Sequence, residues 1–353
     1  MKKYLHIWRA YFVIFFMYQA NSWSLNKILM TGPKFGILTD NATALISFSS
    51  SNKGYGLFMD AIGQGAQKAI RECQYQFQWD RWNCDITSAP LLQRGKTRAT
   101  KETAFVQAIT SAGVMHALTR QCSSGFYNVC SCDESKQDER GGYDWNWGGC
   151  SDNVKVGGRV TKTLLDNLVT KRDDAAVMHL HNNNAGRKAV TRTMRVMCKC
   201  HGPTASCTLK TCWKELASFR KVGRHIKQKY RHALQLDLQE KMKDENDPRQ
   251  RRLLPVLPGG SLVFIEQSPN YCHRNEAEGI LGTLNRQCSR RHKTKKVPGS
   301  ERKSCRNLCR ACGYRVQKRA LEINSTCDCK FQWCCSVKCE PCVVQEDRYY
   351  CVI

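Results

Sequence analysis

The residues best suited to chemistry lie close together between positions 198 and 212. They are Cys198, Cys200, His201, Ser206, Cys207 and Cys212. Cysteine and histidine at such spacings could bind zinc, and a histidine near a serine could activate its hydroxyl as a nucleophile. The same cysteines could instead form nested disulfides. The compartment in which the chain folds decides between these chemistries.

The N-terminus predicts that the chain is secreted. Lys2, Lys3 and Arg9 accompany an apolar run at residues 10–18, which is too short to span a bilayer, and small residues follow at 20–22. We expect a signal peptide at 1–22 and a product that is secreted into the extracellular space and matrix. All 22 cysteines follow that segment. In an oxidising compartment they favour disulfides, and we expect no metal site.

Disulfides would turn residues 198–212 into a short hairpin. A Cys200–Cys207 bond nested inside Cys198–Cys212 leaves residues 201–206 at the tip. A nucleophilic Ser206 with His201 as base lacks an orienting acid nearby. The chain also contains no Gly-x-Ser-x-Gly or His-Glu-x-x-His motif. The hairpin is therefore expected to be displayed rather than catalytic, and the chain is not expected to be an enzyme.

The same reasoning predicts a second hairpin at residues 327–342. Positions that face each other in an antiparallel hairpin have numbers of nearly constant sum. That register selects the pairs Cys327–Cys342, Cys329–Cys339 and Cys334–Cys335. Phe331, Trp333 and Val337 flank the tip. A thin hairpin cannot bury these side chains, so we expect them to contact a partner.

Helical periodicity predicts the elements that position these hairpins. Apolar residues recur at helical spacing over residues 58–73, 105–115, 156–168, 173–185 and 213–234. Asp173 or Asp174 is the expected N-cap of the fourth helix. Residues 181–187, rich in Asn with His and Arg, are expected to form a buried polar network between helices. A polar linker is predicted at 241–260, and residues 262–265 are expected to be a strand that opens a second domain.

These patterns predict an α+β, disulfide-rich protein of two domains. The N-terminal domain, residues 23–240, is a helical bundle from which the first hairpin projects. The C-terminal domain, residues 261–353, holds twelve of the 22 cysteines. It is too poor in apolar residues to build a large core, so cross-links must stabilise it. The second, longer hairpin projects from this domain.

The net charge of +26 indicates an anionic partner. In a secreted chain this favours glycans of the cell surface or matrix and argues against nucleic acid. Residues 290–319 contain twelve Lys or Arg and one acid, Glu301. This stretch is either a solvated face or a contact for heparan sulfate. Asn41 and Asn324 begin glycosylation sequons and are expected to carry N-glycans.

An ordered series of motifs along the chain resembles the Wnt family. Besides the two hairpins, the motifs are Ser22-Trp23-Ser24, Cys73 to Phe77, Arg81-Trp82-Asn83-Cys84, Glu102 to Phe105, Trp147 to Ser151, His181 to Arg187 and Ser268 to Cys272. The resemblance spans nearly the whole mature chain. Thr31-Gly32-Pro33-Lys34 and the spacing of Cys309 and Cys312 are most similar to class-eight Wnts.

The resemblance identifies residues 198–212 as the lipid-bearing thumb of that family and 327–342 as its index finger. It implies a palmitoleoyl ester on Ser206, added by Porcupine, and transport by Wntless; no cofactor is implied beyond this ester and the N-glycans. The acyl chain would bind the cysteine-rich domain of a Frizzled receptor. The finger tip, namely Phe331, Trp333, Cys334, Cys335 and Val337, would grip the opposite side of that domain. A lipoprotein-receptor-related co-receptor would bind elsewhere, so that the ligand activates Wnt signalling in development and cell-fate control.

The resemblance also implies the remaining disulfides. These are Cys73–Cys84, Cys122–Cys130, Cys132–Cys150, Cys272–Cys312, Cys288–Cys305 and Cys309–Cys351, which together with the hairpin bonds use every cysteine. One departure from the family is the thumb tip, where residues 203–205 are Pro, Thr and Ala instead of a small apolar residue followed by Ser-Gly. Thr204 is an alternative acceptor of the lipid. The competing hypothesis is a basic, matrix-bound protein without lipid, and a secreted hydrolase is a more distant one.

Overall fold

The computed structural model divides the chain into two compact units, which are considered separately below. It describes residues 58–84, 98–169, 173–203, 206–236, 258–290 and 299–353. Unit 1 is Met1–Glu72 with Pro90–Gln267, and unit 2 is Cys73–Ala89 with Ser268–Ile353. The predicted signal peptide, Asn41 and most of the predicted linker lie outside the described residues.

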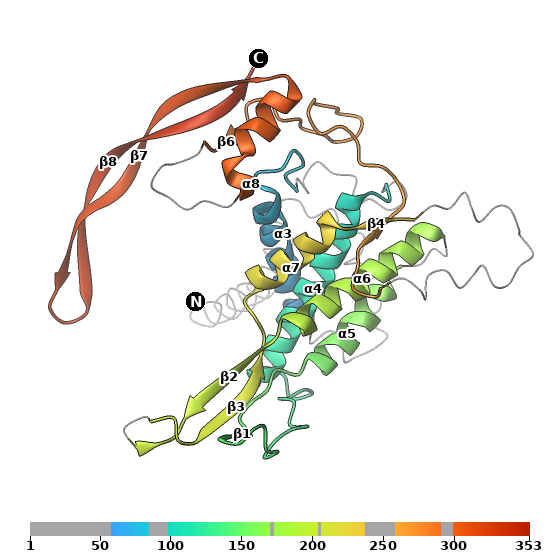
Figure 1. Ribbon diagram of the computed structural model, residues 1–353, viewed down its shortest axis with the longest axis vertical. Coiled ribbons are helices and arrows are strands. Elements are labelled where there is room, and N and C mark those ends of the chain that lie inside the picture. Colours follow the sequence, from blue (N-terminus) through green and yellow to red (C-terminus); the bar gives the residue numbers. More distant parts are fainter. Residues whose placement is uncertain (1–57, 85–97, 170–172, 204–205, 237–257, 291–298) are drawn as a thin grey trace, which may run out of the picture. The chain divides into compact units, whose positions relative to one another are not determined.

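The described part of unit 1 is a helical bundle with a small sheet at one end (Figure 1). Its helices are α3 (Met59–Phe77, which continues into unit 2 after Glu72), α4 (Lys101–Ser123), α5 (Val154–Asp166), α6 (Asp174–Thr193) and α7 (Phe219–Arg231). The side chains of Thr100, Asn153 and Asp173 each accept a hydrogen bond from the backbone N–H three residues on. The predicted N-cap at Asp173 is thus confirmed. Helix α7 is shorter than the periodicity at 213–234 indicates, because both ends of that stretch are strands.

Helix α4 is the centre of the bundle, and small residues let its neighbours approach closely. Most of α4 is buried. A side chain at Gly65 of α3 would lie 2.6 Å from the Cα of Val114, and one at Gly186 of α6 would overlap the carbonyl of Ala108. Only a residue without Cβ fits at such backbone-to-backbone crossings. The apolar cluster between α3, α4 and α5 includes Ile62, Val114, Leu118 and Leu164.

The predicted polar network on α6 is confirmed. The amide of Asn182 donates to the carbonyl of Val263 and accepts from its N–H, both at 3.0 Å. Arg187 donates two hydrogen bonds of 3.0 Å to the carboxylate of Asp166, at the end of α5. His181 hydrogen-bonds the carbonyl of Ser261 at 3.0 Å. Every one of these groups is buried or half-buried, so each needs its partner.

The strand predicted to open the second domain belongs to unit 1 instead. Strand β5 (Val263–Phe264) pairs in parallel with β4 (Leu234–Gln235). Val263 is fully buried and packs in one cluster with Ala99 and Met178. The boundary predicted at residue 261 is therefore wrong, because the hydrogen bonds and apolar contacts of this strand lie with α6 and with Ala99.

Unit 2 has little apolar core and many cross-links. It contains β6 (Gln287–Cys288), α8 (Gly299–Arg302), a π-helical turn (Cys305–Cys309), a 3-10 turn (Arg310–Cys312), β7 (Arg315–Gln332) and β8 (Ser336–Val352). Strand β8 lies between β6 and β7 in an antiparallel sheet. The core cluster consists of Leu308 and four half-cystines. This composition agrees with the expectation that disulfides stabilise the unit.

A segment from the N-terminal side of the sequence also belongs to unit 2. The guanidinium of Arg286 donates to the carbonyls of Gln78, Asp80 and Arg81 at 3.0, 2.8 and 2.6 Å. Arg81 in turn donates to the carbonyl of Asn307. These three hydrogen bonds to one half-buried guanidinium attach residues 78–81 to the rest of unit 2. The predicted domain boundaries did not anticipate this attachment.

Among the described residues ten disulfides are present, each between two cysteines paired in the sequence analysis. They are Cys73–Cys84, Cys122–Cys130, Cys132–Cys150, Cys198–Cys212, Cys200–Cys207, Cys272–Cys312, Cys288–Cys305, Cys309–Cys351, Cys327–Cys342 and Cys329–Cys339. The α+β, disulfide-rich architecture is confirmed. Among the described residues, no helix has both the length and the hydrophobicity needed to cross a membrane.

Candidate functional site

The first hairpin projects from the helical bundle as a twisted pair of strands (Figure 1). Strand β2 (Arg195–Cys200) runs antiparallel to β3 (Lys210–Glu215), with β1 (Trp145–Trp147) parallel to the other edge of β3. Cys198 faces Cys212 directly, as the register requires for their bond. Both cysteine pairs of this hairpin are bonded, so no thiolate remains at the tip to bind a metal ion.

The tip of this hairpin holds Ser206 over a glycine. The N–H of Ser206 donates to the carbonyl of Pro203 at 3.0 Å, and the N–H of Gly202 donates to the carbonyl of Ser206 at 2.8 Å. A Cβ at Gly202 would overlap the hydroxyl oxygen of Ser206. Ser206 is half-buried, and residue 202 must be glycine for the tip to close in this way. Thr204 and Ala205 lie outside the described residues.

The second hairpin is longer than predicted. Its strands, β7 and β8, pair from Arg315 with Val352 to Gln332 with Ser336, well beyond the predicted limits of 327 and 342 (Figure 1). At the tip, Phe331, Trp333 and Val337 have exposed fractions of 69, 95 and 62%. The structure thus brings together the three apolar residues predicted at this tip.

The pairing register within the second hairpin differs from the prediction. Cys327 faces Glu340 and Cys342 faces Ser325, so the Cys327–Cys342 bond is diagonal. The register shifts between Cys327 and Lys330, where Asp328 has a left-handed backbone with φ 48°. An extra residue in one strand bulges out of the ladder, which cysteine spacing does not reveal.

The predicted bond between Cys334 and Cys335 is absent from this structure. The two residues are exposed thiols with sulfur atoms 3.8 Å apart, compared with about 2.05 Å in a disulfide. Both have positive φ angles, 74° and 87°. This backbone lets two adjacent residues close the hairpin but does not bring their sulfur atoms to bonding distance.

Two exposed apolar residues of the second hairpin were missed by the sequence analysis. Val343 and Val344 follow Cys342 on β8, with exposed fractions of 62 and 45%. Adjacent residues of a strand point to opposite faces, so a Val-Val pair on a two-stranded hairpin must expose at least one side chain. That signal was available from the sequence.

The described cations of the basic stretch at 290–319 are exposed in unit 2. They are Arg290, Arg302, Lys303, Arg306, Arg310, Arg315, Lys318 and Arg319. Arg290 and Arg319 lie over the rings of Tyr349 and Tyr350, each 5.0 Å from the ring centroid. Lys318 forms an ion pair of 2.7 Å with Asp347, which raises the lysine pKa through hydrogen bonding and charge attraction. The stretch therefore presents positive charge to solvent.

The chain thus combines a helical bundle that carries one disulfide-stapled hairpin with a cysteine-rich unit that carries a second hairpin. These features define a class of disulfide-rich proteins with two projecting hairpins. Comparison with known proteins identifies the family: the wnt family model matches residues 49–352. The chain belongs to the Wnt family. Its relatives include Protein Wnt-8 of Xenopus laevis, 44% identical over 95% of this chain and 89% of the relative. Human Protein Wnt-8a is 41% identical over 98% of this chain and 94% of the relative.

A solved structure supports the same assignment. A chain in the structure described as human WLS in complex with WNT8A superposes with a TM-score of 0.65 at 39% identity. The match covers 94% of this chain and all of that chain. The similarity to class-eight Wnts predicted from the sequence is thus confirmed. The chain is a Wnt-8-like signalling ligand of the kind that acts in development.

Proposed function

We propose that this chain is a secreted, acylated ligand that binds the cysteine-rich domain of a Frizzled receptor and is not an enzyme. Ser206 carries a palmitoleoyl ester in this proposal, added by Porcupine. The observation that carries it is the serine hydroxyl at the tip of a hairpin stapled by two disulfides. A half-buried serine at the end of a stiff, projecting hairpin can be reached by an acyltransferase, and the hairpin then presents the acyl chain to a receptor groove.

The lipid supplies enough free energy to anchor the complex. About a dozen methylenes at ~0.8 kcal/mol each give an upper bound near ~10 kcal/mol before ordering costs. The exposed finger tip provides a second contact with the same receptor domain, through Phe331, Trp333 and Val337. Two contacts on one domain raise the affinity through effective concentration.

The other partners follow from family membership and charge. Wntless is proposed as the transport partner, because a chain of the human WLS–WNT8A complex matches this one over nearly its whole length. A lipoprotein-receptor-related co-receptor completes the signalling complex. Heparan sulfate is proposed to contact the exposed cations of residues 290–319, and N-glycans are proposed at Asn41 and Asn324. Asn324 is exposed on β7, which is compatible with a glycan.

The first experiment measures the mass of the peptide that contains Ser206, from protein secreted with and without a Porcupine inhibitor. The proposal expects a palmitoleoyl increment that the inhibitor removes. Ser206→Ala should abolish both the increment and Frizzled binding, whereas the control Thr204→Ala should retain both. An unmodified Ser206 peptide from abundantly secreted protein would refute acylation at this site.

A lipid-free, matrix-bound protein is the second candidate. It is favoured by two observations, the net charge of +26 and the Pro-Thr-Ala sequence at 203–205. Proline and alanine restrict a backbone that the family usually builds with glycine. In this case Ser206→Ala would leave receptor binding unchanged, so the same variant separates the two candidates.

A further inference from the structure

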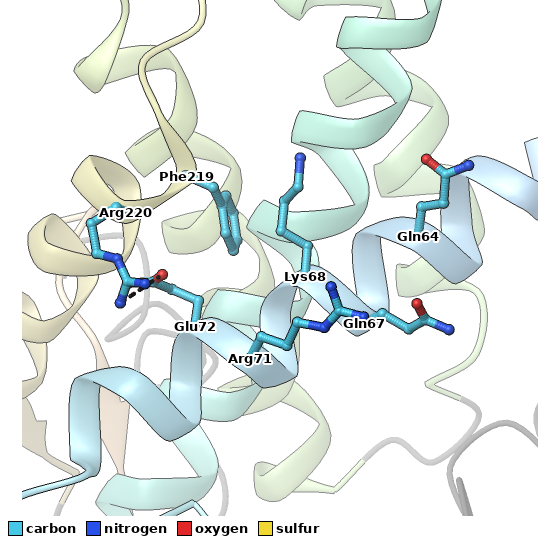
Figure 2. A pocket seen from close by; sticks show the side chains of 7 residues that line it. All are labelled: Gln64, Gln67, Lys68, Arg71, Glu72, Phe219 and Arg220. Atoms are coloured by element: carbon cyan, nitrogen blue, oxygen red, sulfur yellow. Dashed lines mark ion pairs between the residues drawn. The ribbon is translucent and has the colours of Figure 1, made fainter. Parts of the chain in front are cut away.

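A basic groove between α3 and α7 of unit 1 is not used by the proposed function. This α3–α7 groove is a cavity of about 390 Å³. Lys68 and Arg71 enter it from α3 and Arg220 from α7, and Gln64 and Gln67 also line it (Figure 2). The amide of Gln64 already donates to the carboxylate of Asp60 and accepts from the amide of Gln121. Ammonium and guanidinium groups are hydrogen-bond donors with positive charge. The lining holds three of them and one carboxylate, that of Glu72.

The charges of the α3–α7 groove are only partly balanced. Arg220 pairs with the carboxylate of Glu72 at 3.4 Å (Figure 2). Within the described part of the chain, Lys68 and Arg71 form no ion pair or hydrogen bond through their side chains. Burial lowers the pKa of Lys68, and the nearby charge of Arg120 lowers it further. An anion in the groove would relieve this repulsion.

The floor of the groove is built rigidly. Glu72 is only 5% exposed, and a side chain at Gly223 of α7 would overlap its carboxylate. The glycine thus makes room for the acid that holds Arg220 at the rim. Phe219 is buried, with its ring edge-on to His116 at 5.3 Å between centroids. The cations are therefore attached to a packed support rather than to a loop.

Helix α7 extends the positive surface beyond the groove. It contains six Lys or Arg and no Asp or Glu. Arg220, Lys221 and Arg224 are exposed on it. A row of cations along a helix matches a polymer with repeated negative groups better than it matches a single ion. The guanidinium donors favour sulfo groups, whose oxygens accept several hydrogen bonds.

We propose that the α3–α7 groove binds a sulfated glycan, with one sulfo group between Lys68 and Arg71 and its neighbours along the exposed cations of α7. The inference rests on the glycan binding in the proposed function and adds a site in unit 1 to the one proposed at residues 290–319. The two sites lie on separate units, so each is tested by its own variants.

The test compares two variants of the full secreted chain for binding to a heparin-derived oligosaccharide. Lys68→Gln with Arg71→Gln removes the unpaired cations of the groove. The control, Arg159→Gln with Lys162→Gln, removes one Arg and one Lys at the same spacing from the exposed face of α5. We expect the groove variant to bind about tenfold more weakly and the control to change by less than about twofold. Circular dichroism checks that both variants are folded.

Chemical acetylation of lysines, with and without the oligosaccharide, localises the contact. The oligosaccharide should protect Lys68 from acetylation and leave Lys162 unprotected. Equal losses in the two variants, or no loss in the groove variant, would overturn the inference. Stronger binding to vesicles that carry phosphoinositide than to the oligosaccharide would overturn the choice of ligand. If the wild-type chain binds no oligosaccharide, the glycan part of the proposed function fails as well; if it binds and the groove variant is unaffected, only this inference fails.

Discussion

At the scale of single residues, several buried charged side chains of unit 1 are each stabilised by a close ion-pair partner. Glu72 and Arg187 are the clearest cases: each is buried and faces a partner of opposite charge. Removing one partner from such a pair leaves a buried charge without compensation, which costs more than the pair contributes. His116 differs, because burial acts on it without a carboxylate partner at hydrogen-bond distance.

His116 is expected to make the stability of the protein depend on pH. It is 7% exposed, and its Nε2 lies 2.9 Å from the carbonyl of Ala217. Burial lowers its pKa to about 4; the hydrogen bond to Ala217 and the charge of Asp152 oppose this, and the charges of Lys68 and Arg120 reinforce it. Between about pH 6.5 and 4 the unfolded chain binds the proton and the folded chain does not. The free energy of unfolding therefore falls as pH decreases, by about 2 kcal/mol from about pH 7 to pH 5.

Denaturant unfolding at the two pH values, with disulfides intact, measures this effect. His116→Gln should reduce the pH dependence, whereas the exposed control His232→Gln should leave it unchanged. If the free energy of unfolding changes equally between the two pH values in wild type and in His116→Gln, groups other than His116 cause the pH dependence. The lowered pKa values of half-buried His179 and His181, both due chiefly to desolvation, act in the same direction.

At the scale of elements, the glycines on α3, α4 and α6 decide how closely the helices pack. Gly186→Ala should lower the free energy of unfolding by about 1–3 kcal/mol, because the added methyl overlaps the backbone of α4 at Ala108. Gly63→Ala on α3 is the matched control, since no atom lies within 4 Å of its added Cβ. The control should be neutral or more stable by up to about 1 kcal/mol. Thermal unfolding of the two variants measures the difference, and equal destabilisation would contradict the packing argument.

The finger hairpin makes a second prediction at this scale. Trp333 is 95% exposed, so Trp333→Ala should leave folding and acylation unchanged while it weakens binding to the Frizzled cysteine-rich domain by about tenfold or more. Surface plasmon resonance measures the affinity. The control is Tyr143→Ala, which removes a fully exposed aromatic ring from unit 1. An unchanged affinity for Trp333→Ala would remove the tip from the proposed receptor contact.

At the scale of the whole molecule, the two units are stabilised by different means. Unit 1 has a helical core with apolar clusters, whereas the core cluster of unit 2 is mostly half-cystine. Titration with a reductant should therefore unfold unit 2 before the helices of unit 1. Hydrogen exchange measured by mass spectrometry would show early exposure of β7 and β8 while α4 stays protected. If β7, β8 and α4 became accessible to hydrogen exchange at the same reductant concentration, the two units would not unfold independently and the prediction would be wrong.

Much of the fold and of the candidate site was predictable because it depends on neighbours in sequence. The helices follow from apolar residues at helical spacing, and the N-cap at Asp173 from one side chain. The nested cysteines of residues 198–212 determine their hairpin because strand geometry leaves few pairings. The exposed tip at Phe331, Trp333 and Val337 was predictable for the same reason, since a two-stranded hairpin has no interior.

The remaining features were decided by the tertiary structure. The Arg286 contacts that join residues 78–81 to unit 2 connect positions more than two hundred residues apart. The strand at Val263 belongs to unit 1 because Asn182, far away in sequence, pairs with its backbone. The bulge near Asp328, the separated sulfurs of Cys334 and Cys335 and the α3–α7 groove likewise depend on three-dimensional placement. By itself the sequence determined the helices, the hairpins and the family, since local periodicity, cysteine spacing and short motifs encode them. Long-range contacts decided the remaining features, because no local pattern indicates which residues distant in sequence will meet.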